Sequence, residues 1–186
     1  MPQPIFTVAN QLTILRLGLA PLLVVLVLSH EHTWALVTFV VAAVTDLLDG
    51  LAARRGGQQT TLGAMLDPLA DKVLMGSSYI CLTWAPGLLC AIPVWLTVVL
   101  LFRDVVIVMA VAIINLTGER RVFYPSLLGK ISTALQVLTV GVVLLANAVG
   151  ECPAAIRALF WLTLGSTIVS AVHYTFRAST HRTEAP

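Results

Sequence analysis

The chain has 186 residues, of which 58% are hydrophobic and only 11% charged, and its mean hydropathy is +0.93. Soluble domains carry about 25% charged residues, so this composition excludes an ordinary soluble domain and indicates a protein surrounded by membrane lipids. The formal net charge is +2, and we expect no nucleic-acid partner.

Apolar segments of roughly 17 to 25 residues, long enough to cross the hydrocarbon layer as helices, follow one another along nearly the whole chain. Short stretches with polar, Gly or Pro residues separate them, as expected of tight connections. The sequence therefore predicts one all-α integral membrane domain, residues 1–186, with six transmembrane helices at about 11–29, 34–54, 62–83, 92–115, 127–148 and 155–176.

The loop charges predict the orientation, because Lys and Arg are enriched on the cytoplasmic side. The first apolar run contains Arg16 where the core of a signal peptide is uninterrupted, so we expect it to be a retained helix. Both termini are then cytoplasmic in a bacterial inner membrane, on the side of most loop cations: Arg54, Arg55, Arg120, Arg121, Lys130, Arg177 and Arg182.

The three cysteines, Cys81, Cys90 and Cys152, are odd in number and show no C-x-x-C spacing. This pattern indicates neither a zinc site nor a disulfide framework. We expect free thiols.

Four aspartates lie in the stretch "DLLDGLAARRGGQQTTLGAMLDPLAD", residues 46–71. Asp46 and Asp49 are three residues apart and Asp67 and Asp71 four apart, so each pair shares one face of its helix. A charge at the centre of a membrane helix costs at least about 2.5 to 3.5 kcal/mol. The connection between the helices is short, so we expect them to be antiparallel neighbours with both pairs at one depth.

Four converging carboxylates repel one another unless cations hold them. An oxygen-only cluster suits Mg²⁺ or Mn²⁺, and two such ions are a recurrent device for phosphoryl chemistry. Arg54, one turn beyond Gly50, can reach a phosphate. The stretch therefore predicts a site for a phosphate-bearing substrate.

Simpler interpretations exist for single residues. Asp67 before Pro68 is a common helix start, and Asp46 could pair with Arg54 or Arg103 without any metal. Four acids at ordered spacing favour the metal site over these interpretations.

The stretch is similar to the signature of the CDP-alcohol phosphotransferases, D-x2-D-G-x2-A-R-x8-G-x3-D-x3-D. The match has no gap or substitution, and the length and six-helix layout agree as well. The signature residues are Asp46, Asp49, Gly50, Ala53, Arg54, Gly63, Asp67 and Asp71.

The resemblance implies a reaction in which the phosphatidyl group of CDP-diacylglycerol moves to an alcohol and CMP leaves. It assigns two divalent ions to Asp46, Asp49 and Asp67, and assigns metal contact and general base catalysis to Asp71. It also implies a polar active-site cavity at the cytoplasmic side and, often, a homodimer. The implied CDP contacts are Gly50, Ala53, Arg54, Thr60 and Gly63, with Asn10 and Thr13 from "ANQLTILR", which resembles the family's N-x-L-T-x-x-R element.

The alcohol acceptor stays open between two subgroups. Phosphatidylglycerophosphate synthases, which use glycerol 3-phosphate, tend to have Arg-Glu and K-x-K-T elements, whereas this chain has Arg103-Asp104 and Ser132 in place of the second lysine. "RDVVIV" and "PSLLGKISTALQ" look more like cardiolipin synthases of the CDP-alcohol type, which use phosphatidylglycerol. Losing a cation weakens a site for a phosphate monoester, yet four cations could still bind glycerol 3-phosphate: Arg103, Lys130, Arg120 and Arg121. Inositol phosphate or another polar alcohol is a third alternative.

Other interpretations concern these basic residues and the class of protein. Arg103 and Asp104 could be an ion pair that fixes their helix, and Arg120 and Arg121 could face lipid headgroups. A small ion or proton carrier and a structural membrane subunit are the alternative classes. Neither needs Ala53 and Arg54 at fixed distances from two acidic pairs, so the motif favours the enzyme.

Overall fold

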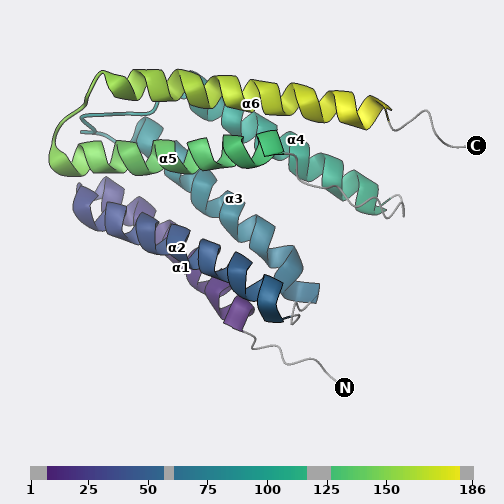
Figure 1. Ribbon diagram of the computed structural model, residues 1–186. Coiled ribbons are helices and arrows are strands. Elements are labelled where there is room, and N and C mark those ends of the chain that lie inside the picture. The colour runs from purple at the N-terminus through teal and green to yellow at the C-terminus, as the bar shows by residue number, and fades with distance from the viewer. Residues whose placement is uncertain (1–7, 57–60, 117–126, 181–186) are drawn as a thin grey trace, which may run out of the picture. The chain divides into compact units, whose positions relative to one another are not determined.

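The computed structural model describes residues 8–56, 61–116 and 127–180, with side chains described within 14–46, 70–109 and 127–172. Over these residues the chain forms six helices and no strand (Figure 1). Their bounds are α1 Val8–Leu28, α2 His32–Gly56, α3 Thr61–Trp84, α4 Val94–Leu116, α5 Leu127–Val149 and α6 Ala155–Thr180. The six predicted helices are thereby confirmed as helices, with ends that differ from the predicted ones by a few residues.

Two of these helices are long and apolar enough to cross a membrane over their described residues, Leu127–Val149 and Ala155–Val172. The described parts of α1 and α2, Ile14–Leu28 and His32–Asp46, are apolar but shorter. The prediction of all-α structure is confirmed, and the number of membrane spans stays a prediction.

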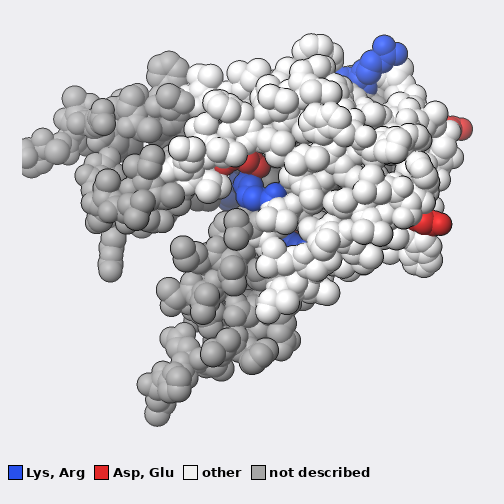
Figure 2. Space-filling model, turned by 180° about the vertical axis from the view of Figure 1, so that it is seen from behind, with Lys and Arg blue, Asp and Glu red and all other residues white. Residues whose placement is uncertain are grey.

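The distribution of polar and apolar side chains suits an apolar solvent. Thr97 and Ser132 are fully buried, whereas Phe102 is 70% exposed and Leu127 is 74% exposed. The described surface in Figure 2 carries very few charged side chains. Because soluble domains expose few large apolar patches, these faces are the ones that lipid would cover.

The chain divides into two compact units. Unit 1 comprises Met1–Ala91 and Val140–Cys152, and unit 2 comprises Ile92–Thr139 and Pro153–Pro186. In unit 1, α1 packs against both α2 and α3 (Figure 1). The end of α5 joins this unit where Phe39 of α2 lies over Gly141, and a Cβ atom added at Gly141 would lie 3.7 Å from the ring.

Two helices of unit 1 end in the same way. After α1 the His30 amide donates to the Val27 carbonyl and the Glu31 amide to the Leu26 carbonyl, with His30 at a φ of 61°. After α5 Gly150 adopts a φ of 81° and the Glu151 amide donates to the Ala146 carbonyl. Such left-handed caps satisfy the last carbonyls of a helix and stop it within one residue.

Cys90 and Cys152 form a disulfide with a Cα–Cα distance of 5.4 Å. The expectation of free thiols is therefore wrong for these two residues, and Cys81 is the free, buried cysteine. An odd count and a missing C-x-x-C motif do not exclude one long-range bridge. The two cysteines are 62 residues apart in sequence and meet because the α3–α4 connection folds over the end of α5.

Asn147 of α5 fixes the same connection. Its Oδ1 accepts from the amides of Leu89 and Cys90 at 2.9 and 3.2 Å, and its Nδ2 donates to the carbonyls of Cys90 and Val143 at 2.8 Å each. These bonds use both donors and both acceptor positions of the amide. The buried Asn147 and the disulfide thus hold one loop at two neighbouring points.

In unit 2, α4 packs against α6, and Trp95 stacks on Trp161 with ring centroids 5.0 Å apart. The first part of α5 contacts α6 through hydroxyl groups, with Thr139 Oγ1 2.8 Å from Thr163 Oγ1. Hydrogen bonds of this kind between helices are a common means of association in membranes.

Candidate active site

Three helices of unit 1 meet at a small apolar contact formed by Ala20 of α1, Ala42 of α2 and Leu74 of α3. All three side chains are almost completely buried. Two of them are alanines, which let the helix backbones approach closely. This contact fixes the three helices at one common level.

A polar layer lies one turn from this contact, towards the start of α1, the end of α2 and the start of α3. Arg16 precedes Ala20 by four residues, Asp46 follows Ala42 by four, and Asp71 precedes Leu74 by three. Residues three or four apart lie on one helix face, about one 5.4 Å turn apart. Asp46 and Asp71 therefore lie at a similar depth, as predicted. The helix that sets this depth is α1, which contacts both α2 and α3.

Asp46 forms an ion pair with α1, the helix that carries the "ANQLTILR" element, whose last residue is Arg16. Arg16 Nη1 lies 2.9 Å from Asp46 Oδ1, and the two side chains are 2% and 49% exposed. Over the described side chains Asp46 pairs with Arg16, whereas the alternative of a pair with Arg54 falls on a side chain outside the described ones. Two signals pointed to Arg16: it is a charged residue inside an apolar segment, and such residues are usually paired or functional, and it is the last residue of "ANQLTILR".

Asp71 and its neighbour Lys72 are half-buried, and both take part in hydrogen bonds or electrostatic contacts. A carboxylate at this position is shielded in part from water but still reachable. The role of Asp71 as a general base stays a prediction.

The remaining predicted residues of this region are placed only by their helices. Asp49, Gly50, Ala53 and Arg54 lie in the last turns of α2, Gly63 and Asp67 in the first turns of α3, and Asn10 and Thr13 in the first turns of α1. Their side chains lie outside the described ones, as do Thr60, Arg120 and Arg121 altogether. Asp67 and Pro68 stand inside α3, which begins at Thr61, so the interpretation of Asp67 as a helix cap is wrong.

The described donors suit a hard cation. Asp46 and Asp71 offer carboxylate oxygens, the ligands that Mg²⁺ and Mn²⁺ take. Asp46 stays half exposed beside its partner, with Oδ1 engaged by Arg16. No group of three such ligands occurs among the side chains described, which do not include those of Asp49 and Asp67. The two described carboxylates are of the ligand type that Mg²⁺ and Mn²⁺ take, and the two metal ions stay a prediction.

Unit 2 holds the described residues predicted to bind the acceptor. Arg103 Nη1 lies 3.2 Å from Asp104 Oδ1, with side chains 10% and 18% exposed. This agrees with the interpretation of Arg103 and Asp104 as an ion pair. Lys130 is exposed on the first turn of α5.

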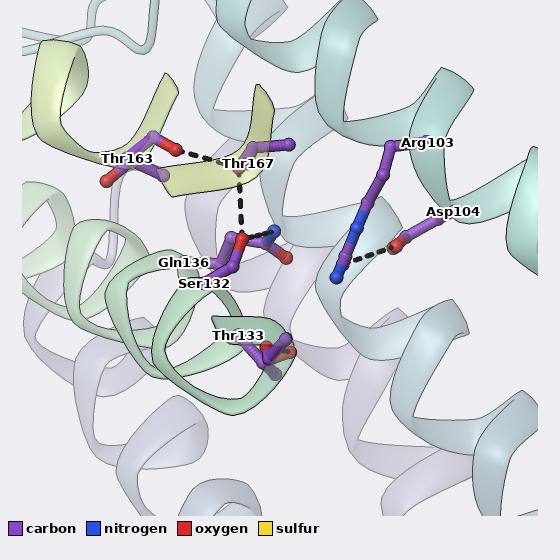
Figure 3. A network of polar contacts seen from close by, with 8 residues as sticks. Arg103, Asp104, Ser132, Thr133, Gln136, Thr163 and Thr167 are labelled. Carbon is purple, nitrogen blue, oxygen red and sulfur yellow. Dashed lines mark hydrogen bonds and ion pairs between the residues drawn. The ribbon is translucent and has the colours of Figure 1, made fainter. Parts of the chain in front are cut away.

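Ser132 belongs to a neutral hydrogen-bond network, which Figure 3 shows beside the Arg103–Asp104 pair. Its Oγ lies 3.2 Å from Thr167 Oγ1 of α6 and accepts from Gln136 Nε2 at 3.3 Å. Thr167 Oγ1 donates to the Thr163 carbonyl at 2.7 Å. Sequence reasoning singled out Ser132 but not Thr167, because the partner on α6 is chosen by packing.

Several known proteins are similar to this chain over most of its length. A rat cardiolipin synthase (CMP-forming) is 36% identical over 91% of this chain, which spans 60% of that relative's length. A probable phosphatidylglycerophosphate synthase of Mycobacterium tuberculosis is 35% identical over 94% of this chain and 82% of its own length. The CDP-diacylglycerol–glycerol-3-phosphate 3-phosphatidyltransferase of Bacillus subtilis is 30% identical over 91% of this chain and 93% of its own.

The sequence profile of the CDP-alcohol phosphatidyltransferases matches residues 6–169. The match takes in the polar layer, the aspartate stretch and most of α6. The chain therefore belongs to the CDP-alcohol phosphatidyltransferase family.

Proposed function

We propose that the chain transfers the phosphatidyl group of CDP-diacylglycerol to an alcohol and releases CMP. The observation that carries this proposal is the common level of Asp46 and Asp71, each one turn from the Ala20–Ala42–Leu74 contact. Asp49 and Asp67 continue the same two helix faces towards the loop between them. From this spacing we expect all four carboxylates to converge at one end of unit 1.

Asp46, Asp49, Asp67 and Asp71 would hold two Mg²⁺ or Mn²⁺ ions. When bound, two such ions supply compensation for the charge of the phosphates and of the departing CMP. The residues proposed to hold the CDP part are Gly50, Ala53, Arg54, Thr60, Gly63, Asn10 and Thr13.

Asp71 is the proposed general base. Its half-buried carboxylate takes the proton of the acceptor hydroxyl while that oxygen bonds to the β-phosphorus of CDP-diacylglycerol. The bond from this phosphorus to the CMP oxygen breaks, and CMP leaves with the electron pair. Arg54 at the end of α2 would stabilise the negative charge on the leaving group.

Phosphatidylglycerol is the acceptor that unit 2 supports best, which would make cardiolipin the product. The charge of Arg103 is already balanced by Asp104 at 3.2 Å, and Ser132 is neutral and buried. Among the described residues this region offers little uncompensated positive charge for a phosphate monoester. A phosphodiester acceptor carries less negative charge and needs less.

Glycerol 3-phosphate is the second candidate acceptor. Lys130 is an exposed cation at the start of α5, and Arg120 and Arg121 belong to the preceding loop. The relatives from Mycobacterium tuberculosis and Bacillus subtilis, which this chain spans over 82% and 93% of their lengths, carry names of that acceptor class.

The same proposal places six helices across a bacterial inner membrane, with both termini and the aspartates at the cytoplasmic side. Loop cations support this orientation. The Cys90–Cys152 disulfide also supports it, because it lies at the other end of unit 1, after α3 and α5. Disulfides persist in oxidising compartments such as the periplasm.

The test is an assay of CMP release from CDP-diacylglycerol by the purified full chain, followed by lipid analysis. CMP should appear only with Mg²⁺ or Mn²⁺ and a suitable alcohol, and phosphatidylglycerol should give cardiolipin. A product made from glycerol 3-phosphate alone would move the proposal to the second acceptor. CMP release without any divalent ion, or none with any alcohol, would overturn it.

A further inference from the structure

Arg16 is a buried charge in an apolar helix, with only 1% of the residue exposed. A guanidinium carries a delocalised charge and five N–H donors, and burying it without partners is costly. Such a charge persists only when it is paired and hydrogen-bonded. Its ion pair with Asp46 therefore needs an explanation beyond the packing of α1.

The packing of α1 against α2 fixes the position of the Arg16 guanidinium. Arg16 and Asp46 are each one turn from the alanine of their own helix, Ala20 or Ala42, in the contact that also includes Leu74. The register between α1 and α2 is thus set by tight contact of small residues next to the ion pair. The Asp46 carboxylate is held from the side of α1.

Only the Asp46 side of the Arg16–Asp46 ion pair is accessible from outside the protein. The Arg16 side chain is 2% exposed and cannot offer a surface to a substrate, whereas the Asp46 side chain is 49% exposed. Arg16 binds Oδ1 at 2.9 Å, which restricts rotation of the carboxylate and leaves Oδ2 as a donor. An ion pair that served only to join two helices would not need one partner kept half open.

We propose that Arg16 is a positioning residue that orients Asp46 for a divalent cation. Mg²⁺ and Mn²⁺ sites depend on ligand geometry, and groups that hold a metal ligand in place are typically worth 10- to 100-fold in metal affinity or activity. This inference rests on the proposed function, because it uses the metal site assigned there.

The experiment measures Mn²⁺ binding to the purified full chain without substrate, by electron paramagnetic resonance or calorimetry. Arg16→Gln should weaken Mn²⁺ binding by about 10- to 100-fold. Arg16→Lys keeps the charge but loses the planar fork, and its loss should be smaller.

Two control variants separate positioning from general damage. Ser78→Ala removes a buried hydroxyl of α3 in the same unit, where Ser78 Oγ donates to the Leu74 carbonyl at 2.7 Å. Arg157→Gln removes one exposed positive charge. Both should bind Mn²⁺ like the unchanged protein.

A double-mutant cycle with Asp46→Asn tests whether Arg16 acts through Asp46. Arg16→Gln should then add little to the loss that Asp46→Asn causes, whereas independent effects would add. Should Arg16→Gln fail to fold, Arg16→Lys with an unchanged melting temperature carries the same comparison.

Unchanged Mn²⁺ affinity in a folded Arg16 variant, or additive losses in the double-mutant cycle, would overturn the inference about Arg16. The proposed function would still stand if the protein without substitutions releases CMP. An unchanged protein that neither binds Mn²⁺ nor releases CMP would overturn both.

Discussion

Both units bury neutral polar side chains and each holds an ion pair, but the carboxylates of the two pairs differ in exposure, 49% for Asp46 and 18% for Asp104. Unit 1 buries a charge, Arg16, against a carboxylate that is 49% exposed. Unit 2 buries hydroxyl and amide groups, with Ser132, Gln136 and Thr167 bonded to one another. Its charged pair, Arg103 and Asp104, is mostly buried as well.

The difference indicates what each arrangement can do. A neutral network that satisfies its own donors and acceptors holds helices together and asks for no ligand. A charged layer with one carboxylate half open has capacity left for a cation. The comparison therefore supports the proposal that the chemistry belongs to the layer of unit 1, and the proposal that unit 2 influences the choice of acceptor.

The largest expected effect comes from Asp71→Asn in the charged layer. The amide cannot take the acceptor's proton, and a general base contributes about 10² to 10⁴ in rate. We expect a loss of that size or more in CMP release, with binding of the nucleotide substrate retained in a direct binding assay. Near-normal turnover would exclude Asp71 as the general base and would contradict the proposal that the charged layer of unit 1 carries the chemistry.

Removal of the disulfide tests whether unit 1 can lose stability without losing activity. For a loop closed over 62 residues, the chain-entropy estimate of stabilisation is about 4 kcal/mol. Replacing Cys90 and Cys152 together with Ser should lower the melting temperature in detergent, whereas kcat and Mn²⁺ affinity stay near those of the unchanged protein. Cys81→Ser is the matched control for loss of a thiol. A large fall in kcat at a temperature where the variant is folded would contradict this separation.

Asp104→Asn tests the charge balance of unit 2. Without the carboxylate, the Arg103 guanidinium is free to bind a phosphate monoester, and a hydrogen bond to a charged group is worth about 1.5 kcal/mol or more, roughly tenfold in binding. The ratio of kcat/KM for glycerol 3-phosphate over phosphatidylglycerol should rise about tenfold. An unchanged ratio would show that the pair does not influence acceptor choice.

The smallest effect is expected in the neutral network. Thr139→Val removes the bond between Thr139 Oγ1 and Thr163 Oγ1, which measures 2.8 Å. Hydrogen bonds between membrane helices average about 0.6 kcal/mol, so the melting temperature should fall slightly and turnover should not change. A strong loss of turnover in a stable variant would indicate that residues of unit 2 take part in the reaction.

Much of the fold could be predicted from local pattern. Long apolar segments and the polar breaks between them predicted six helices, because backbone hydrogen bonds in an apolar solvent must be satisfied within each helix. The helix ends differ where caps decide them, as at His30, whose φ of 61° is uncommon for a residue other than Gly.

The partners were harder to predict than the helices. Arg16 was visible as a charge in an apolar run, yet its pairing with Asp46 depends on which faces of α1 and α2 meet. Cys90 and Cys152 could not be paired from sequence, because the approach of two loops 62 residues apart is a property of the packed unit.

The sequence by itself determined the six helices and the aspartate motif, since these depend on hydropathy and fixed spacing along one chain. Only the tertiary structure decided that α1 joins α2 to α3, that Arg16 holds Asp46 and that a disulfide closes the opposite end of unit 1. The physical reason is that periodicity fixes the face of a helix on which a residue lies, whereas close packing of small side chains such as Ala20 and Ala42 selects the face it meets.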